Sequence, residues 1–168
     1  MTIVIGGARM NENDDVVNGK PGDQKQTQTP DMNGEVSLCD FYVHSKGWYI
    51  FRPKSSLHAK RIAKKMETAC NNSNIGYDQE NRLEIIEKGV KSKTKISCDC
   101  SSLVRACIKE GTGKDPGNFT TDTAASFLEN SNLFEDKKEY VDGMELFKGD
   151  VLITKQKGHA AIIVQGNN

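Results

Sequence analysis

The residue with the most chemical potential in this chain is Cys100, which stands at the start of an expected helix. Asp99 precedes it, two serines follow it, and the apolar residues then recur at the spacing of one helix face. These positions are Cys100, Leu103, Val104, Cys107 and Ile108. Cys100 is therefore expected in the first turn, where free backbone N–H groups and the helix dipole favour a negative charge. Such a position lowers the pKa of a thiol, and the thiolate is the nucleophilic form.

A histidine that opens an apolar strand is the second candidate. Residues 148–154 read as a turn followed by a strand, and His159 comes directly before a second strand. Each residue also has a structural interpretation, since a small cysteine often fills a core and a histidine at a strand end can be satisfied by hydrogen bonds. The pair favours catalysis, because a thiol and an imidazole at such positions are what a Cys–His hydrolase requires. This chemistry requires no metal or other cofactor.

The elements that must position this pair follow from hydrophobic periodicity and capping residues. Strands are expected at residues 2–5, 48–51, 150–154 and 159–165. Helices are expected from a Ser55 or Ser56 cap to Asn71, from an Asp78 cap through Val90, from Cys100 to before Gly111, and from Thr121 or Asp122. Short strands, then helices, then a C-terminal antiparallel pair indicate the α+β class.

Length and composition limit the alternatives. The 168 residues suggest a single catalytic domain over 1–168, with a polar loop region at about 8–35. Lys+Arg and Asp+Glu number 23 each, so charge gives no reason to expect nucleic acid or a membrane surface as partner. No apolar run approaches the ~20 residues of a membrane span, and the N-terminus lacks the features of a signal peptide. The five cysteines are an odd number, so a disulfide framework is not expected.

The same motifs carry a resemblance to a known family. Asp99-Cys100-Ser101-Ser102, then Gly149-Asp150 before a strand, then Gly158-His159 at the next strand resemble the NlpC-type cell-wall peptidases. Looser matches resemble a phage and prophage lysin subgroup: Gly6-Gly7-Ala8-Arg9, Gly22-Asp23-Gln24, Glu35-Val36, Arg52-Pro53-Lys54 and Gly76-Tyr77-Asp78-Gln79. The resemblance therefore covers most of the chain.

This resemblance implies a papain-like fold, with helices packed on a small antiparallel sheet and the nucleophile at a helix N-terminus. It implies a peptidoglycan hydrolase that cuts an amide or peptide bond through a thioester, with the Cys100 backbone N–H as an oxyanion donor. A lysin of this kind would be made in the cytoplasm without a signal peptide and would act at the cell wall after release.

Two departures from the family pattern leave roles open. The family usually places a third polar residue on the strand after the histidine strand, and this chain has no such strand. Gln165, or Asp23 and Gln24 of the N-terminal loop, are the candidates for orienting His159. The family also has a tyrosine near the oxyanion site, for which Tyr77 is the best match, although a long expected helix separates it from Cys100.

Three alternatives to the hydrolase interpretation remain open. Cys98, Cys100, Cys107 and a histidine offer ligands for zinc in a non-catalytic wall-binding or structural module, although the Cys-x-Cys spacing is unusual for zinc. Asn11, Asn13, Asp15 and Asp23 offer oxygen ligands for calcium, without the glycine and glutamate of an EF-hand. An acyltransferase on the same fold would use the same Cys–His pair.

The basic helix face with Lys60 and Lys64 is expected to be solvated. His44 and His58 are expected to be surface or packing residues.

Overall fold

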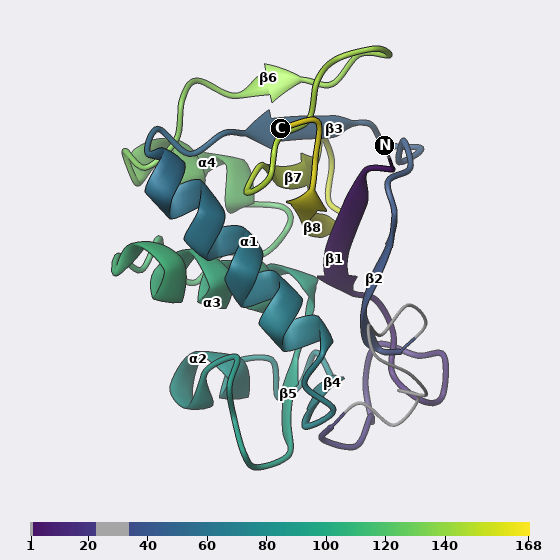
Figure 1. Ribbon diagram of the computed structural model, residues 1–168. Coiled ribbons are helices and arrows are strands. Elements are labelled where there is room, and N and C mark those ends of the chain that lie inside the picture. Colours follow the sequence, from purple (N-terminus) through teal and green to yellow (C-terminus); the bar gives the residue numbers. More distant parts are fainter. Residues whose placement is uncertain (1, 23–33) are drawn as a thin grey trace.

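The strands form a six-stranded antiparallel sheet and a separate parallel pair within residues 2–22 and 34–168, which the computed structural model describes (Figure 1). The order in the large sheet is β2-β1-β8-β7-β3-β6. Its strands are β1 (Val4–Ala8), β2 (Val36–Asp40), β3 (Trp48–Phe51), β6 (Lys138–Glu139), β7 (Val151–Thr154) and β8 (Ala160–Gln165). The first strand therefore pairs with the last one inside the sheet, where β1 lies between β2 and β8.

Helices α1 (Ser56–Cys70) and α3 (Cys100–Thr112) pack against each other and against β8 on one face of the sheet (Figure 1). The core between helices and sheet contains Ile62, Met66, Leu103, Ile108, Val151 and Ile162. The other sheet face buries a smaller cluster around Trp48 and Leu152. This arrangement confirms the predicted α+β class, with helices packed on a small antiparallel sheet.

Helix α1 forms where its cap and periodicity predicted it. The Ser55 hydroxyl accepts a hydrogen bond from the His58 N–H at 3.2 Å, which satisfies one free donor of the first turn. The apolar side faces the core through Ile62 and Met66, and the basic side remains exposed. The helix ends at Asn71, whose backbone N–H bonds the Glu67 carbonyl.

The connection between α1 and α3 differs from the prediction. Strands β4 (Ile75–Tyr77) and β5 (Ile96–Cys98) pair in parallel, and the helix between them, α2, spans only Glu84–Lys88. Asp78 does not cap this helix, because its carboxylate instead accepts from the Glu80 N–H at 2.9 Å and the Asn81 amide at 3.0 Å. The polar residues before Leu83 therefore form a turn rather than the first part of a long helix.

Helix α3 continues past the predicted end at Gly111 and stops before Gly113, which adopts a left-handed conformation at φ 80°. Gly111 is needed for packing rather than for termination. A Cβ at this position would lie 2.9 Å from the backbone nitrogen of Ile62, so glycine allows α1 and α3 to approach closely.

The remaining boundaries shift by a few residues. Helix α4 (Ala124–Asn130) begins after a turn at 121–123, later than predicted, and β1 lies two residues beyond the predicted start and extends to Ala8. The strands at 48–51, 150–154 and 159–165 were predicted to within one residue, whereas β2, β4, β5 and β6 were not predicted.

None of the described helices has the length and apolar character needed to cross a membrane.

Candidate active site

Cys100 is the first residue of α3, directly after β5 and a capping aspartate. The Asp99 carboxylate accepts from the Ser102 N–H at 2.8 Å, and the Ser102 hydroxyl accepts from the Asp99 N–H at 2.9 Å. This reciprocal capping box fixes where the helix begins. Cys100 is 8% exposed, so its thiol stands at the helix N-terminus with limited access to water.

Arg82 also stabilises the start of α3, and this role was not predicted from the sequence. Its Nε donates to Asp99 at 2.7 Å, and its Nη2 donates to the Ser101 hydroxyl at 2.9 Å and to the Phe119 carbonyl at 2.8 Å. Both side chains of the Arg82–Asp99 ion pair are mostly buried, at 16% and 10% exposure. Asp99 therefore acts as a helix cap and an arginine partner, which makes it a positioning residue for Cys100.

His159 stands immediately before β8 and is fixed by its own backbone. Its N–H donates to the Thr154 hydroxyl at 3.0 Å, and its carbonyl accepts from the Thr154 N–H at 3.0 Å. The imidazole lies beside the rings of His44 and Trp48, with centroids 6.4 and 6.1 Å away. Its Nε2 is buried and has no hydrogen-bond partner within the described part of the chain.

One cavity of about 280 Å³ brings Cys100 and His159 together. The other residues that line it come from the segment after β1, the loop between β2 and β3, and the end of β4. They are Ala8, Arg9, Met10, Val16, Tyr42, His44, Tyr77, Gln79 and Gly158. The backbone N–H of Ala160 lies close enough to the Cys100 thiol to lower its pKa, so the sulfur lies near the residue that follows the histidine.

Both catalytic candidates are neutral in the resting site at pH 7. Burial, followed by the negative charge of Asp99, raises the pKa of the Cys100 thiol to about 12, although nearby backbone N–H groups oppose this. Burial, followed by the positive charge of Arg9, lowers the pKa of His159 to about 4. The backbone N–H groups at the helix N-terminus do lower the thiol pKa, as expected, but burial and the Asp99 charge outweigh them, so the net shift is upward.

Tyr77 lines the same cavity, although a long helix was predicted between it and the nucleophile. The parallel pairing places Tyr77 opposite Cys98, two residues before Cys100. Its hydroxyl accepts from the Gln79 amide at 3.1 Å. Burial, followed by the charge that Cys100 would carry, raises the pKa of Tyr77 well above its ordinary value, so its hydroxyl keeps its proton.

The candidates for orienting His159 are not brought to it in the described part of the chain. Gln165 lies at the far end of β8, where its amide donates to the Thr2 carbonyl at 2.9 Å. Asp23 and Gln24 lie outside the described residues. The neighbour of β8 on the side away from β7 is β1, from which a Cβ at Gly7 would lie 3.6 Å from His159 Nε2.

The described residues considered for zinc binding do not form a cluster, and Asp23 of the calcium set lies outside the described residues. Among the described residues, no group of three or more His, Cys, Asp or Glu side chains is arranged to hold a metal ion. Cys98 and Cys107 are fully buried at 0% exposure, and burial raises the pKa of both thiols. The Asn11 amide oxygen accepts from the Asn13 and Asp15 N–H groups and stabilises a turn.

Comparison with known proteins yields one family. The model of a family described as an endolysin-like domain matches residues 5–168, which is nearly the whole chain. Neither a curated protein nor a solved structure matches the chain.

Proposed function

Because the chain belongs to the endolysin-like domain family, we propose that it is a cysteine peptidase or amidase of a phage or prophage lysin, related to the NlpC type. Family membership supports a cell-wall lytic function. The observation that supports the cysteine chemistry is the single cavity that Cys100 and His159 share. The substrate of this reaction would be an amide or peptide bond of peptidoglycan, reached at the wall after release of the protein.

In the proposed reaction, the thiol is activated only as it attacks. The neutral imidazole of His159 accepts the thiol proton while Cys100 sulfur bonds to the amide carbonyl carbon. The imidazolium then protonates the leaving amine, and a thioester remains. A water molecule, deprotonated by the same imidazole, attacks the thioester and releases the carboxylic acid and the free thiol.

The negative oxygen of the tetrahedral intermediate needs a donor near the sulfur. The Cys100 N–H is free of intrahelical bonds, because Cys100 is the first residue of α3. The Tyr77 hydroxyl is a second donor, since it lines the same cavity and keeps its proton. Fixed donors of this kind stabilise a developing oxyanion without reorganisation.

Variants of the two reacting residues test this proposal. Cys100→Ala should abolish lysis of purified cell walls, and His159→Ala should lower it by roughly 10²–10⁴-fold or more, as expected for a general base. Cys98→Ala is the matched control, because Cys98 is a buried neighbour outside the cavity. Circular dichroism of each of the three variants checks that it is folded. Lysis by Cys100→Ala at the wild-type rate would contradict the cysteine mechanism. Mass spectrometry of the wild-type products identifies the bond that is cut.

A further inference from the structure

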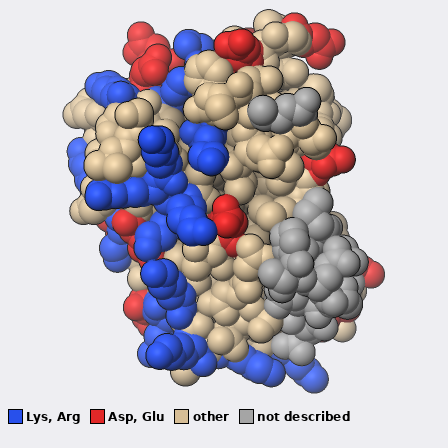
Figure 2. Space-filling model, viewed as in Figure 1, with Lys and Arg blue, Asp and Glu red and all other residues tan. Residues whose placement is uncertain are grey.

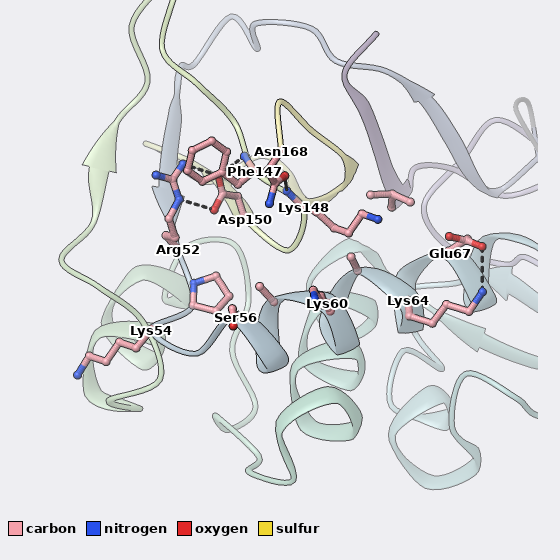
Figure 3. A pocket seen from close by; sticks show the side chains of 14 residues that line it. Arg52, Lys54, Ser56, Lys60, Lys64, Glu67, Phe147, Lys148, Asp150 and Asn168 are labelled. Carbon is pink, nitrogen blue, oxygen red and sulfur yellow. Dashed lines mark hydrogen bonds and ion pairs between the residues drawn. The ribbon is translucent and has the colours of Figure 1, made fainter. Parts of the chain in front are cut away.

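A second and larger cavity, of about 530 Å³, lies between α1 and the residues that follow β3 and precede β7 (Figure 3). Its floor is apolar and includes Ala59 and Ala63 of α1 together with Val164 of β8. Its rim carries lysines from two segments, with Lys60 and Lys64 on α1 and Lys148 before β7 (Figure 3). This cavity, named the lysine groove below, shares no lining residue with the cavity of Cys100 and His159.

The acidic side chains of the lysine groove are already neutralised. Asp150 is fully buried and accepts from Arg52 Nε at 2.9 Å and Nη2 at 2.7 Å. Glu67 pairs with Lys64 at 3.1 Å. Among the described residues, no carboxylate lies within ion-pair distance of Lys54, Lys60 or Lys148. The groove therefore presents positive charge that the protein does not balance locally, although the whole chain is neutral.

The lysine groove continues along α1 rather than ending as a closed pocket. A second hollow shares Lys64 and Glu67 with it and runs past the end of α1 to Lys91. A helix of 15 residues is about 22 Å long at ~1.5 Å per residue, so the hollow surface is far longer than one small anion. Figure 2 shows the corresponding lysine and arginine side chains as a blue band that runs over α1 and toward α2.

We propose that the lysine groove binds a linear phosphodiester polymer attached to the cell wall, which would hold the protein beside its substrate. Lysine ammonium groups attract phosphates as point charges, and the first turn of α1 adds free N–H groups without an acidic residue. The aromatic side chain of the groove, Phe147, is covered by the Arg52 guanidinium at 4.1 Å. Without a free ring on which bases can stack, the groove fits a base-free polymer better than a nucleic acid.

The lysine groove lies where a bound polymer could anchor the protein without blocking the active-site cavity. Val164 borders the groove and His159 borders the active-site cavity, and they lie roughly 17 Å apart along β8 at ~3.3 Å per residue. A bound polymer would therefore leave the Cys100 cavity open. This inference rests on the proposed wall-lytic function, which places the protein at such polymers.

The test measures binding in the Cys100→Ala background, so that no hydrolysis occurs during the experiment. The probes are soluble poly(glycerol phosphate), single-stranded DNA of similar charge, and cell walls before and after hydrogen fluoride removes phosphodiester polymers. The groove variant is Lys60→Glu with Lys148→Glu. The control is Lys137→Glu with Lys138→Glu, which changes the net charge equally and lies outside the groove. Lys60→Gln with Lys148→Gln removes charge without reversing it, in case the reversal unfolds the protein.

We expect the charge reversal to weaken poly(glycerol phosphate) binding at least tenfold and to reduce its salt dependence, while the control stays within twofold. Extracted walls should lose most of the binding, and DNA should bind more weakly than the polymer. Equal binding by groove and control variants, equal binding to extracted walls, or tighter binding to DNA would each overturn the proposal. Hydrolysis of extracted walls by the chain with Cys100 intact tests the proposed function separately, because it does not need the polymer.

Discussion

The pKa values of Cys100 and His159 argue against a stored thiolate–imidazolium pair. A thiol with a pKa of about 12 and an imidazole with a pKa of about 4 are both uncharged at pH 7. Under the proposed mechanism, proton transfer must therefore accompany the attack of sulfur on the substrate. A bound substrate would also displace water from the cavity and bring polar groups to the buried Nε2 of His159.

The acid limit of activity follows from the histidine. Under the proposed mechanism, His159 acts as a base only when neutral, and it is neutral above its pKa of about 4. We expect the rate of wall lysis to hold from pH 7 down to about pH 5 and to fall about tenfold per pH unit below pH 4. Turbidity assays with circular dichroism at each pH measure this. A decline centred near pH 6.5, in protein that remains folded, would show that the burial of His159 is relieved during catalysis.

Arg82 is predicted to support catalysis without touching the substrate. Arg82→Ala removes the partner of Asp99 and the bonds to Ser101 and Phe119. We expect a loss of about 2–3 kcal/mol in the free energy of unfolding, below the range for a fully buried pair. Lysis at a temperature where the variant is folded should fall at least tenfold, because the start of α3 is no longer fixed. Arg82→Lys should restore little, since one ammonium cannot reproduce the forked contacts.

A control variant distinguishes a role of Arg82 in positioning Cys100 from a general effect on the stability of the fold. Arg105→Ala removes the ion pair of α3 with Asp115 at 2.8 Å, which lies outside the cavity. It should lower the unfolding free energy by a smaller amount and leave the lysis rate of the folded protein unchanged. If Arg82→Ala behaves the same way, Arg82 has only a structural role.

The sequence identified Cys100 and His159 as the candidates for the reacting residues, whereas it did not predict most of their surroundings. Cys100 and His159 each open an element with a strong apolar pattern, so their positions could be read from neighbouring residues. Arg82 and His44 reach the site through contacts between distant segments, and Tyr77, which only the family resemblance had suggested, reaches it through the pairing of β4 with β5. No local pattern marks such contacts, and the burial that controls both pKa values is likewise a property of the folded chain.

Gly111 tests the contact between α1 and α3. Alanine favours a helix over glycine by about 1 kcal/mol, yet its Cβ would press on the Ile62 backbone at 2.9 Å. We expect Gly111→Ala to lower the free energy of unfolding by about 1–2 kcal/mol, since overpacking outweighs the propensity gain. Urea unfolding measures the difference. Gly113→Asn at the end of the same helix is the control, because no atom would contact a Cβ there and asparagine tolerates a left-handed conformation. A stabilised Gly111→Ala variant would mean that the helices can move apart without loss.

Elements with a long or strongly apolar pattern were predictable, and short ones were not. Helix α1 has a serine cap and a repeating apolar face, and β7 and β8 are nearly continuous apolar runs. Strands β4 and β5 have three residues each, too few to show a period, and are stabilised by pairing with one another. The prediction of a long helix after Asp78 also failed, because the polar turn that follows Asp78 has the local sequence of a helix cap.

The whole sheet depends on the first strand. Deleting residues 1–8 removes β1, which pairs with β2 on one side and β8 on the other. We expect the shortened chain to lose both cooperative thermal unfolding and wall lysis, because β8 loses a partner beside His159. Removing only Met1 and Thr2 should leave the midpoint of unfolding nearly unchanged, since both precede β1. A folded, active chain without β1 would show that β7 alone is enough to position β8.

The pairing of β1 with β8 also determines when the protein can become active during its synthesis. Val4 leaves the ribosome early, but its partner Gln165 is added near the end of the chain. At ~5–20 residues per second, the first strand waits about 8–30 s for that partner. The nucleophile is likewise translated before its base. Under the proposed mechanism, a nascent chain that has not yet reached His159 lacks the base and is harmless to the wall, and catalysis begins only after β8 has been made and has paired with β1.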